Sequence, residues 1–503
     1  MNRIKFITPP AVLAVLSLFA TACGSPDFDN VTDLSNTPEI SPDYTGVTIP
    51  PNIAPMNFLI NEEADYYRVE VTSSGGKRLS VSSRDGKVRF PEREWRRITD
   101  NSTGGEIKLE VFAYDREEKK MKSFMPFYMY VAEEKIDPYL VYRKIHPGYY
   151  SWYRMKIMQR STESFREESI AENQLLDNNC INCHSFSRND PETFLLHVRG
   201  SMGGTYFSGE GGLKRRELRT ESMPANATYP SWHPSGKYVA FSANSVRQSF
   251  YAHSDNNIEV FDLESSLVIY DIESNSMYQP GGPEAKEYMQ TFPGWSPDGM
   301  YLYYSRTRKP DFEIDAENVK NISYDIARRP FDPSSGTLGE PEIVFDASEI
   351  GKSASFPKVS PDGRHLVFTL HDYGTFPVWS SEAELYLIDL ESGELSKPEI
   401  GSDDTESYHG WSSNGKWLVF SSKRKDGVSS RPYFSYFGSP GNPGKPFVLP
   451  QRDPTTYGRM LHSFNLPELV TGKVEIGPRD FERASSEDPL MAVPAAGTAG
   501  YGE

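Results

Sequence analysis

Four segments of this chain repeat one pattern, and this repetition constrains the fold more than any other feature. They are residues 229–244, 291–307, 355–371 and 407–423. In each segment a large residue precedes a tight turn, most often Ser-Pro-Asp-Gly, and a strand with large apolar residues follows. The large residues Trp232, Trp295, Val359 and Trp411 are 63, 64 and 52 residues apart. A unit that recurs at this interval predicts a stack of similar small sheets.

Further strands are expected between the copies, for example at 267–272, so that each unit holds about four strands. Four-stranded units of about 40–60 residues are typical of propeller blades. The W-S-P-D-G-x-x-L-x-Y/F pattern resembles the TolB-type β-propellers with their WD40-like repeats, which implies a propeller of five or six blades over residues 191–480. We expect residues 194–218 to begin the ring and strands near 460–464 to complete its first blade.

The composition is that of a soluble chain with room for several domains. Its 503 residues are 37% hydrophobic and 13% aromatic, which argues against low-complexity disorder. The net charge of −17 repels phosphate backbones, so nucleic acid is not an expected partner. After residue 22 no apolar run approaches the roughly 20 residues of a membrane-spanning helix. The three cysteines, Cys23, Cys180 and Cys183, are too few for a disulfide framework.

Residues 1–22 have the pattern of a signal peptide. Two basic residues, Arg3 and Lys5, precede an apolar stretch that is too short to span a membrane. The sequence Ala-Thr-Ala-Cys that ends at Cys23 resembles the lipobox of bacterial lipoproteins. This resemblance implies a lipid on Cys23 and an outer-membrane lipoprotein that faces the periplasm or the cell surface. The alternative is ordinary cleavage that leaves a free Cys23 thiol, and in either case residues 23–55 are expected to form a flexible tether.

Residues 56–135 predict a small β domain. Tyr67, Val69 and Val71 alternate with polar residues, as in a half-buried strand, and Gly-containing turns separate several similar runs. Regularly spaced strands over about 80 residues favour a β-sandwich similar to the fibronectin type III domain. Nothing in this region suggests catalysis, so we expect a spacer or docking module.

Residues 136–190 carry the motif with the clearest chemistry. We expect a helical connector, because residues 161–176 have a helix-favouring composition. The connector leads into Cys180-Ile181-Asn182-Cys183-His184, the C-x-x-C-H pattern of c-type haem attachment. Two thiols at this spacing form thioethers with one haem, and the adjacent histidine binds its iron. The motif therefore predicts one covalent haem c, lying between the connector helix and the first propeller blade.

Other uses of the cysteine pair stay open. A Cys-x-x-Cys pair can also form a redox dithiol or disulfide, although the βαβ context of thioredoxin-like proteins is absent here. A structural zinc site takes four ligands, and the sequence offers no second cysteine pair.

The sixth iron ligand is expected to be His197, with Met202 as the alternative, because small cytochromes use His or Met at this place. Met155, Met158 and His146 lie upstream of the motif and are further candidates. A five-coordinate iron is also compatible with the sequence.

The lipobox, the β domain, the sequence NCINCHSF, the following HVRG and the propeller repeats together resemble a family of Bacteroidota envelope proteins described as PD40-repeat, TolB-like or cytochrome-c-related. The resemblance covers nearly the whole chain. It implies a mainly β, membrane-anchored protein with a role in electron transfer or other redox chemistry, in which the propeller is a docking platform for envelope protein partners. Residues 481–503 would form a flexible tail.

Two other functions are compatible with the same features. One is a propeller scaffold that binds envelope proteins or glycans, and the other is a haem peroxidase in which His197 and Arg199 lie beside an open iron. The sequence contains no G-x-S-x-G, P-loop or H-E-x-x-H signature. An enzymatic activity is therefore not the leading expectation.

Overall fold

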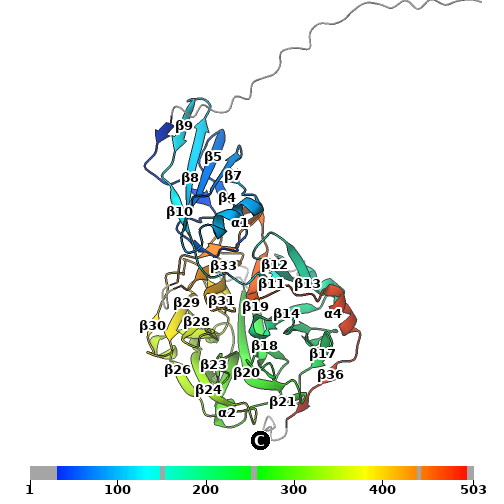
Figure 1. Ribbon diagram of the computed structural model, residues 1–503. Coiled ribbons are helices and arrows are strands. Elements are labelled where there is room, and N and C mark those ends of the chain that lie inside the picture. The colour runs from blue at the N-terminus through cyan, green and yellow to red at the C-terminus, as the bar shows by residue number, and fades with distance from the viewer. Residues whose placement is uncertain (1–30, 148–152, 251–257, 439–442, 496–503) are drawn as a thin grey trace, which may run out of the picture.

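The computed structural model describes residues 31–147, 153–250, 258–438 and 443–495 and shows two β-rich bodies (Figure 1). The smaller body is N-terminal, in blue and cyan, and the larger body contains most of the remaining chain. The predicted signal peptide and Cys23 lie outside the described residues. Within these residues no helix has the length and apolar character needed to cross a membrane.

The smaller body holds two sheets and a helix that share one apolar core. The larger sheet has the order β1-β9-β8-β10-β3, with β5 and β6 added through β8, and the smaller sheet has the order β2-β4-β7. Trp95 and Ile98 of the helix, α1, are buried in the shared core. The bounds are β1 Val31–Asp33, β2 Ile40–Ser41, β3 Thr48–Ile49, β4 Phe58–Ile60, β5 Tyr66–Ser73, β6 Arg78–Ser83, β7 Lys87–Val88, α1 Glu92–Asp100, β8 Glu106–Asp115, β9 Lys120–Ser123 and β10 Phe127–Val131.

The prediction of a flexible tether over residues 23–55 is wrong for its described part, 31–55. Three short strands lie in this stretch, and Tyr44, Val47 and Ile53 are buried in the core of the smaller body. The Gly and Pro residues of the stretch belong to the turns between these strands, where they are favoured for their backbone conformations. The alternation at Tyr67–Val71 is confirmed, because β5 buries every second residue.

The larger body is a ring of six sheets, as far as the described residues show (Figure 1). The sheets are β35-β11-β12-β13, β14 to β17, β18 to β21, β22 to β26, β27 to β30 and β31 to β34. One inner strand of each sheet contacts the inner strands of its two neighbours, in the order β14, β18, β22, β27, β31, β35 and back to β14. A closed ring of such sheets is the arrangement of a β-propeller.

The strand bounds of the ring follow in chain order: β11 Tyr139–Ile145, β12 Lys156–Ser161, β13 Glu167–Glu172, β14 Cys180–Phe186, β15 Phe194–Arg199, β16 Gly204–Phe207, β17 Lys214–Glu217, β18 Ala227–Trp232, β19 Tyr238–Phe250, β20 Ile258–Asp271, β21 Ser276–Tyr278, β22 Tyr288–Trp295, β23 Tyr301–Arg308, β24 Asp325–Asp332, β25 Thr337–Leu338, β26 Glu342–Phe345, β27 Ser353–Val359, β28 His365–His371, β29 Glu384–Asp389, β30 Leu395–Ser396, β31 Glu406–Trp411, β32 Trp417–Ser422, β33 Arg431–Tyr436, β34 Phe447–Val448 and β35 Ser463–Val470. The helices are α2 Pro283–Glu287, α3 Thr456–Arg459 and α4 Pro478–Ser485.

The predicted helical connector is wrong. The described residues between 139 and 172 contain β11, β12 and β13, so the ring begins at Tyr139 and not at residue 191. The sequence of β13, Glu-Glu-Ser-Ile-Ala-Glu, has helix-favouring residues. Pairing with β12 buries Ile170 and Ala171 against the next sheet of the ring, and such packing overrides a weak local preference.

The C-terminal part of the chain closes the ring. β35 pairs antiparallel with β11, so the first and last strands of the ring share a sheet. We expected strands near residues 460–464 to close the ring by joining the sheet of residues 194–218. The closing strand β35 instead joins β11, and the strands of residues 194–218 belong to the next sheet. The predicted flexible tail is wrong for residues 481–495, because Phe481 of α4 is buried and two short strands, β36 (Leu490–Met491) and β37 (Val493–Pro494), add to β17 and β21.

The repeats identified in the sequence recur as equivalent structural positions. Trp232, Trp295 and Trp411 are all buried at the ends of inner strands. Each indole N–H donates to a backbone carbonyl of the preceding sheet, at distances of 3.1 to 3.4 Å, and the acceptors are Ser185, Ser231 and Lys358. These bonds connect successive sheets at the same level of the ring.

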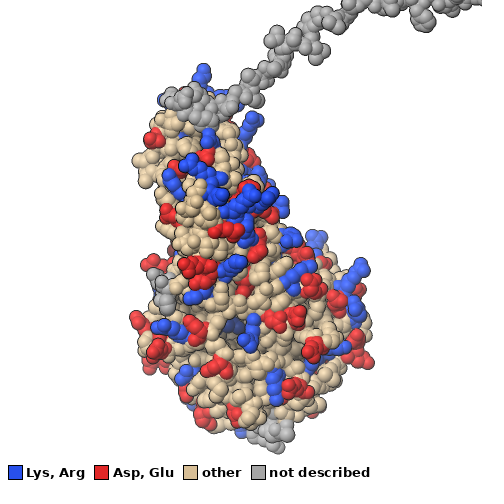
Figure 2. Space-filling model, in the orientation of Figure 1, with Lys and Arg blue, Asp and Glu red and all other residues tan. Residues whose placement is uncertain are grey.

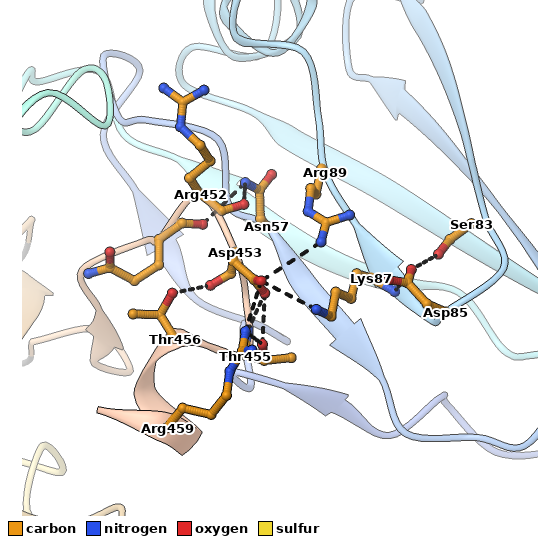
Figure 3. A network of polar contacts seen from close by, with 11 residues as sticks. Asn57, Ser83, Asp85, Lys87, Arg89, Arg452, Asp453, Thr455, Thr456 and Arg459 are labelled. Atoms are coloured by element: carbon orange, nitrogen blue, oxygen red, sulfur yellow. Dashed lines mark hydrogen bonds and ion pairs between the residues drawn. The ribbon is translucent and has the colours of Figure 1, made fainter. Parts of the chain in front are cut away.

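The two bodies are joined by a polar network and by shared apolar packing (Figure 3). Asp453, in the segment before β35, lies 3.3 Å from the Lys87 ammonium of the smaller body and 2.9 Å from the Arg459 guanidinium of its own segment. The Asn57 amide donates to the carbonyls of Gln451 and Arg452. Because Trp417 of the ring also lies in the core of the smaller body, the two bodies have a continuous interior.

Candidate functional site

Each inner strand of the ring contains a β-bulge near its middle. In β18, β22, β27 and β31 the pairing register with the next strand shifts at equivalent places, and β35 shifts against β11. Five bulge residues have φ values of 47° to 58°: Tyr229, Phe292, Phe356, Tyr408 and Leu466. Such φ values are rare for residues with large side chains. Their recurrence on five inner strands shows that the bulge is a regular structural feature of the ring.

The C-x-x-C-H motif occupies the same position in β14. The register shift of this strand falls between Ile181 and His184, so by pairing register Asn182 and Cys183 match Tyr229 and Pro230 of β18. The indole bonds, which join Trp232 to Ser185 and Trp295 to Ser231, instead match Cys183 and His184 to Tyr229 and Pro230, and we adopt this second match. The motif therefore lies on an inner strand of the ring rather than at the end of a helix. The motif was expected between a connector helix and the first propeller sheet. Of these two neighbours the sheet is present, because β14 is the first strand of the sheet of β14 to β17.

The bulge residues of neighbouring sheets pack against one another around the centre of the ring. The ring centroids of Tyr229 and Phe292 are 4.8 Å apart, those of Phe292 and Phe356 are 4.0 Å apart, and those of Phe356 and Tyr408 are 5.0 Å apart. These four residues form an aromatic wall around the centre of the ring. Cys183 of β14, the sixth inner strand, is buried and lies beside this wall.

A cavity of about 230 Å³ lies against this wall. Its lining contains the bulge residues, the prolines that follow most of them, and polar side chains that include His184, Ser185, Arg188, Asn189, Lys358, His409 and Glu468. Cys183 and His184 thus share one cavity with groups from the opposite end of the sequence. Figure 2 shows a hollow near the centre of the ring, with the blue of a basic side chain inside it.

His184 is buried, and neither ring nitrogen forms a hydrogen bond of normal geometry among the described residues, although an interaction with the backbone of Leu466 opposes the lowering of its pKa. Its Nε2 lies 4.0 Å from Oε2 of Glu468. Burial lowers the pKa of His184 to about 3, so the imidazole is neutral at physiological pH. Buried polar atoms are nearly always hydrogen-bonded, and a neutral imidazole without such bonds has a free lone pair for a ligand.

The two cysteines of the motif are free thiols with different surroundings. Burial raises the pKa of Cys183, which lines the cavity. Cys180 is half-buried at the start of β14 and lies outside the cavity lining. The cavity therefore holds the second thiol and the histidine of the motif, while the first thiol lies at the end of the same strand.

Glu468 and Lys358 are two of the charged side chains in the cavity lining. Oε1 of Glu468 accepts a hydrogen bond of 2.9 Å from the backbone N–H of Phe186, and burial raises the pKa of Glu468 to about 7. Burial lowers the pKa of Lys358. In the part of the chain that the structure describes, no Asp or Glu side chain has an oxygen within 4 Å of the Lys358 nitrogen.

The candidate sixth ligands lie elsewhere. His197 is buried in β15, with Nδ1 3.2 Å from Oγ1 of Thr205, and Met202 lies in the turn after that strand. Met155 is in the apolar core between sheets, Met158 packs against the core of the smaller body, and His146 lies 3.1 Å from His462. None of these residues lines the cavity that contains His184.

Sequence reasoning missed Lys358, His409 and Glu468. Each follows, or belongs to, the two-residue bulge of an inner strand, which is Phe356-Pro357, Tyr408-His409 or Leu466-Pro467, so alignment of the inner strands was the available signal for all three. That alignment also needs residues 463–470, which do not contain the Asp-Gly turn that identified the other copies.

Comparisons with known proteins give the following. No family model matches the chain, and no curated protein matches it. Among solved structures, an oligogalacturonate lyase in complex with manganese is 12% identical over 60% of this chain and 72% of that one, with a TM-score of 0.34. The Dos1 propeller is 14% identical over 54% and 63% of the two chains, with a TM-score of 0.34. Hydrazine synthase of Kuenenia stuttgartiensis is 10% identical over 64% and 48%, with a TM-score of 0.38.

Free metal ions have no evident site in the described chain. No group of three or more His, Cys, Asp or Glu side chains within those residues is arranged to hold one.

Proposed function

We propose that this protein carries one covalent haem c in the central cavity of its ring and takes part in electron transfer or related redox chemistry. The single observation behind the proposal is the buried His184 imidazole, which lies beside Cys183 in the cavity wall and forms no hydrogen bond of normal geometry among the described residues. A buried histidine that is held only by weak polar contacts costs the fold free energy, so packing alone does not account for it. When bound, haem would supply a one-electron redox centre.

The residues present fit haem in kind. Cys180 and Cys183 offer two free thiols, His184 offers a neutral nitrogen, and the aromatic wall offers an apolar surface for a flat macrocycle. The cavity volume of about 230 Å³ lies below the roughly 300–1,000 Å³ of sites that enclose ligands. The proposal therefore requires the aromatic side chains of the wall to turn aside, with the strands that carry them unchanged.

The rest of the molecule would serve this site. We take the six sheets as six propeller blades and the smaller body as a β-sandwich of the fibronectin type III kind. A lipid on Cys23 would anchor the chain to the outer membrane, on its periplasmic or outer side. The exposed faces of the propeller would dock an envelope protein that exchanges electrons with the haem.

The test is expression in a host that attaches c-type haem, followed by intact mass and an absorption spectrum. The wild-type protein should gain the mass of one haem and show a Soret band. Cys183→Ala should lose the normal two-thioether attachment, and His184→Ala should lose the proximal ligand. Cys23→Ser is the matched control, because it removes the third cysteine and leaves the motif intact.

The small size of the cavity favours a second candidate, a propeller scaffold that binds envelope proteins or glycans without haem. The same experiment separates the two. A folded wild-type protein that acquires no covalent haem in that host contradicts the redox function and leaves the scaffold.

A further inference from the structure

The central cavity contains a lysine at a place where the other inner strands have none. Lys358 of β27 follows the Phe356-Pro357 bulge and lines the cavity. The residues that follow the bulge in the other inner strands are Ser185, Ser231, Gly294, Gly410 and Glu468. A lysine in a cavity is costly unless its nitrogen has a partner, so its occurrence at this place calls for an explanation.

Lys358 has no partner of opposite charge. Among the described residues no Asp or Glu oxygen lies within 4 Å of its nitrogen. The acid in the cavity lining, Glu468, accepts its hydrogen bond from the backbone N–H of Phe186 instead. Burial lowers the pKa of Lys358, and the charge of Glu468 only partly opposes this. A ligand with a negative charge would supply the partner that the chain does not.

A second cation lies at the same cavity. Arg188 is exposed in the turn between β14 and β15, lines the cavity, and has no ion pair within the described ranges. Hydrogen bonds fix this turn, because the Asn189 amide donates to the carbonyls of Trp411 at 3.1 Å and Leu469 at 2.7 Å. The Trp411 indole donates in turn to the Lys358 carbonyl at 3.4 Å. Trp411 therefore links the turn that carries Arg188 to the strand that carries Lys358.

Much of the remaining lining is apolar. The side chains of the aromatic wall and the prolines that follow most of them form surfaces against which a planar ring packs well. The volume of about 230 Å³ lies below the roughly 300–1,000 Å³ of sites for drug-sized ligands, so a small ligand with one ring suits it. Glu468 in the same lining would repel a doubly charged group more strongly than a single carboxylate.

We propose that the cavity of the haem-free protein binds a small monocarboxylic acid with one flat ring, whose carboxylate pairs with Lys358 and whose ring packs against the aromatic wall. Arg188 would attract the anion to a chain whose net charge is −17. The inference goes beyond the proposed function and does not rest on it, because it concerns the cavity at its present size. A haem that filled the cavity would exclude the acid.

The test is isothermal titration calorimetry on the wild-type protein from a host that does not attach haem. The probes are 3-phenylpropionate and 3-phenylpropionamide, which have nearly the same shape and differ in charge. The acid should bind at least tenfold more tightly than the amide. Lys358→Met, which keeps the apolar part of the side chain, should weaken the acid at least tenfold and leave the amide within twofold.

Two further variants act as controls. Lys352→Ala removes an exposed lysine just before β27, where it pairs with Asp372, and should change neither affinity. Arg188→Gln should weaken the acid by only about threefold, because an exposed charge is screened by solvent.

Three results would overturn the inference. The first is equal affinity for acid and amide, a comparison that needs no variant. The second is a folded Lys358→Met protein, checked by circular dichroism, that binds the acid as tightly as the wild type. The third is the absence of binding by 3-phenylpropionate, phenylacetate and benzoate at millimolar concentration. None of them bears on haem attachment, which the mass and spectrum of the protein from the haem-attaching host decide separately.

Discussion

β14 and β31 place a histidine at the same point of the ring, and they differ in what surrounds it. His409 of β31 is buried and has one nitrogen 3.0 Å from a backbone carbonyl. His184 of β14 is also buried, but neither nitrogen forms a hydrogen bond of normal geometry among the described residues, and only the backbone of Leu466 interacts with it. The preceding residue is Tyr408, an aromatic of the wall, in one strand and Cys183 in the other. One backbone position thus serves packing in β31 and presents reactive groups in β14.

The largest expected effect is a difference in the free energy of unfolding between two bulge variants, one at a packing residue and one at a reactive residue. Phe292→Ala should lower the free energy of unfolding by about 3–5 kcal/mol, because it removes a buried ring from the aromatic wall. Cys183→Ala in the haem-free protein should cost about 1 kcal/mol, since only a small side chain is lost. Urea denaturation of both variants measures the difference, and equal losses would mean that β14 is an ordinary packing strand.

A second prediction concerns pH and the histidine of β31. Burial lowers the pKa of His409 to about 3 from its ordinary value of 6.5. The unfolded chain therefore binds a proton below pH 6.5 that the folded chain excludes until about pH 3, so acid destabilises the fold across that window. In the haem-free protein, His409→Leu should flatten the fall in unfolding free energy between pH 6 and pH 4 by about 1.4 kcal/mol per pH unit.

The control for that measurement is His462→Leu. His462 is less buried and its pKa is only modestly lowered, mainly by partial burial, so its replacement should change the slope much less. Identical slopes for wild type and His409→Leu would show that this histidine is protonated in the folded ring.

A smaller effect tests the bonds between sheets. β14 has Phe186 where β22 has Trp295, whose N–H donates to the Ser231 carbonyl at 3.1 Å. Trp295→Phe makes β22 resemble β14 and should cost about 1 kcal/mol, because a buried carbonyl loses its donor. Urea denaturation again provides the measurement. No loss would mean that the repeated indole bonds do not stabilise the ring.

The smallest effect is expected at His184. In the haem-free protein His184→Leu should change the free energy of unfolding by less than about 0.5 kcal/mol, because it removes a polar group that forms no hydrogen bond of normal geometry among the described residues. A loss above about 1.5 kcal/mol would show that the imidazole has a structural partner and would weaken its assignment as a ligand.

The features that the sequence predicted correctly are set by local chemistry. Ser296, Asp298 and Gly299 define their turn within four residues, through the Ser296 to Asp298 hydrogen bond and the positive φ of Gly299. The C-x-x-C-H spacing is likewise local; Cys183 and His184 line one cavity, while the haem that the motif predicts stays a prediction. Patterns of this kind need no knowledge of which strands become neighbours.

The features that it missed depend on distant contacts. Residues 167–172 favour a helix but form β13, because β12 and the next sheet offer a surface to bury Ile170. Glu468 and Lys358 meet His184 only when the ring closes through β35 and β11. Neither closure nor the order of inner strands can be read from any one segment.

The most direct measurement of the central claim is peptide mass spectrometry of the wild-type protein from a host that attaches c-type haem. The account predicts that the peptide containing Cys180 and Cys183 is heavier by one haem and that both thiols resist alkylation, while all other peptides have their calculated masses. A folded protein in which both thiols are alkylated and this peptide has its unmodified mass would contradict the claim that β14 is the haem-bearing strand of the ring.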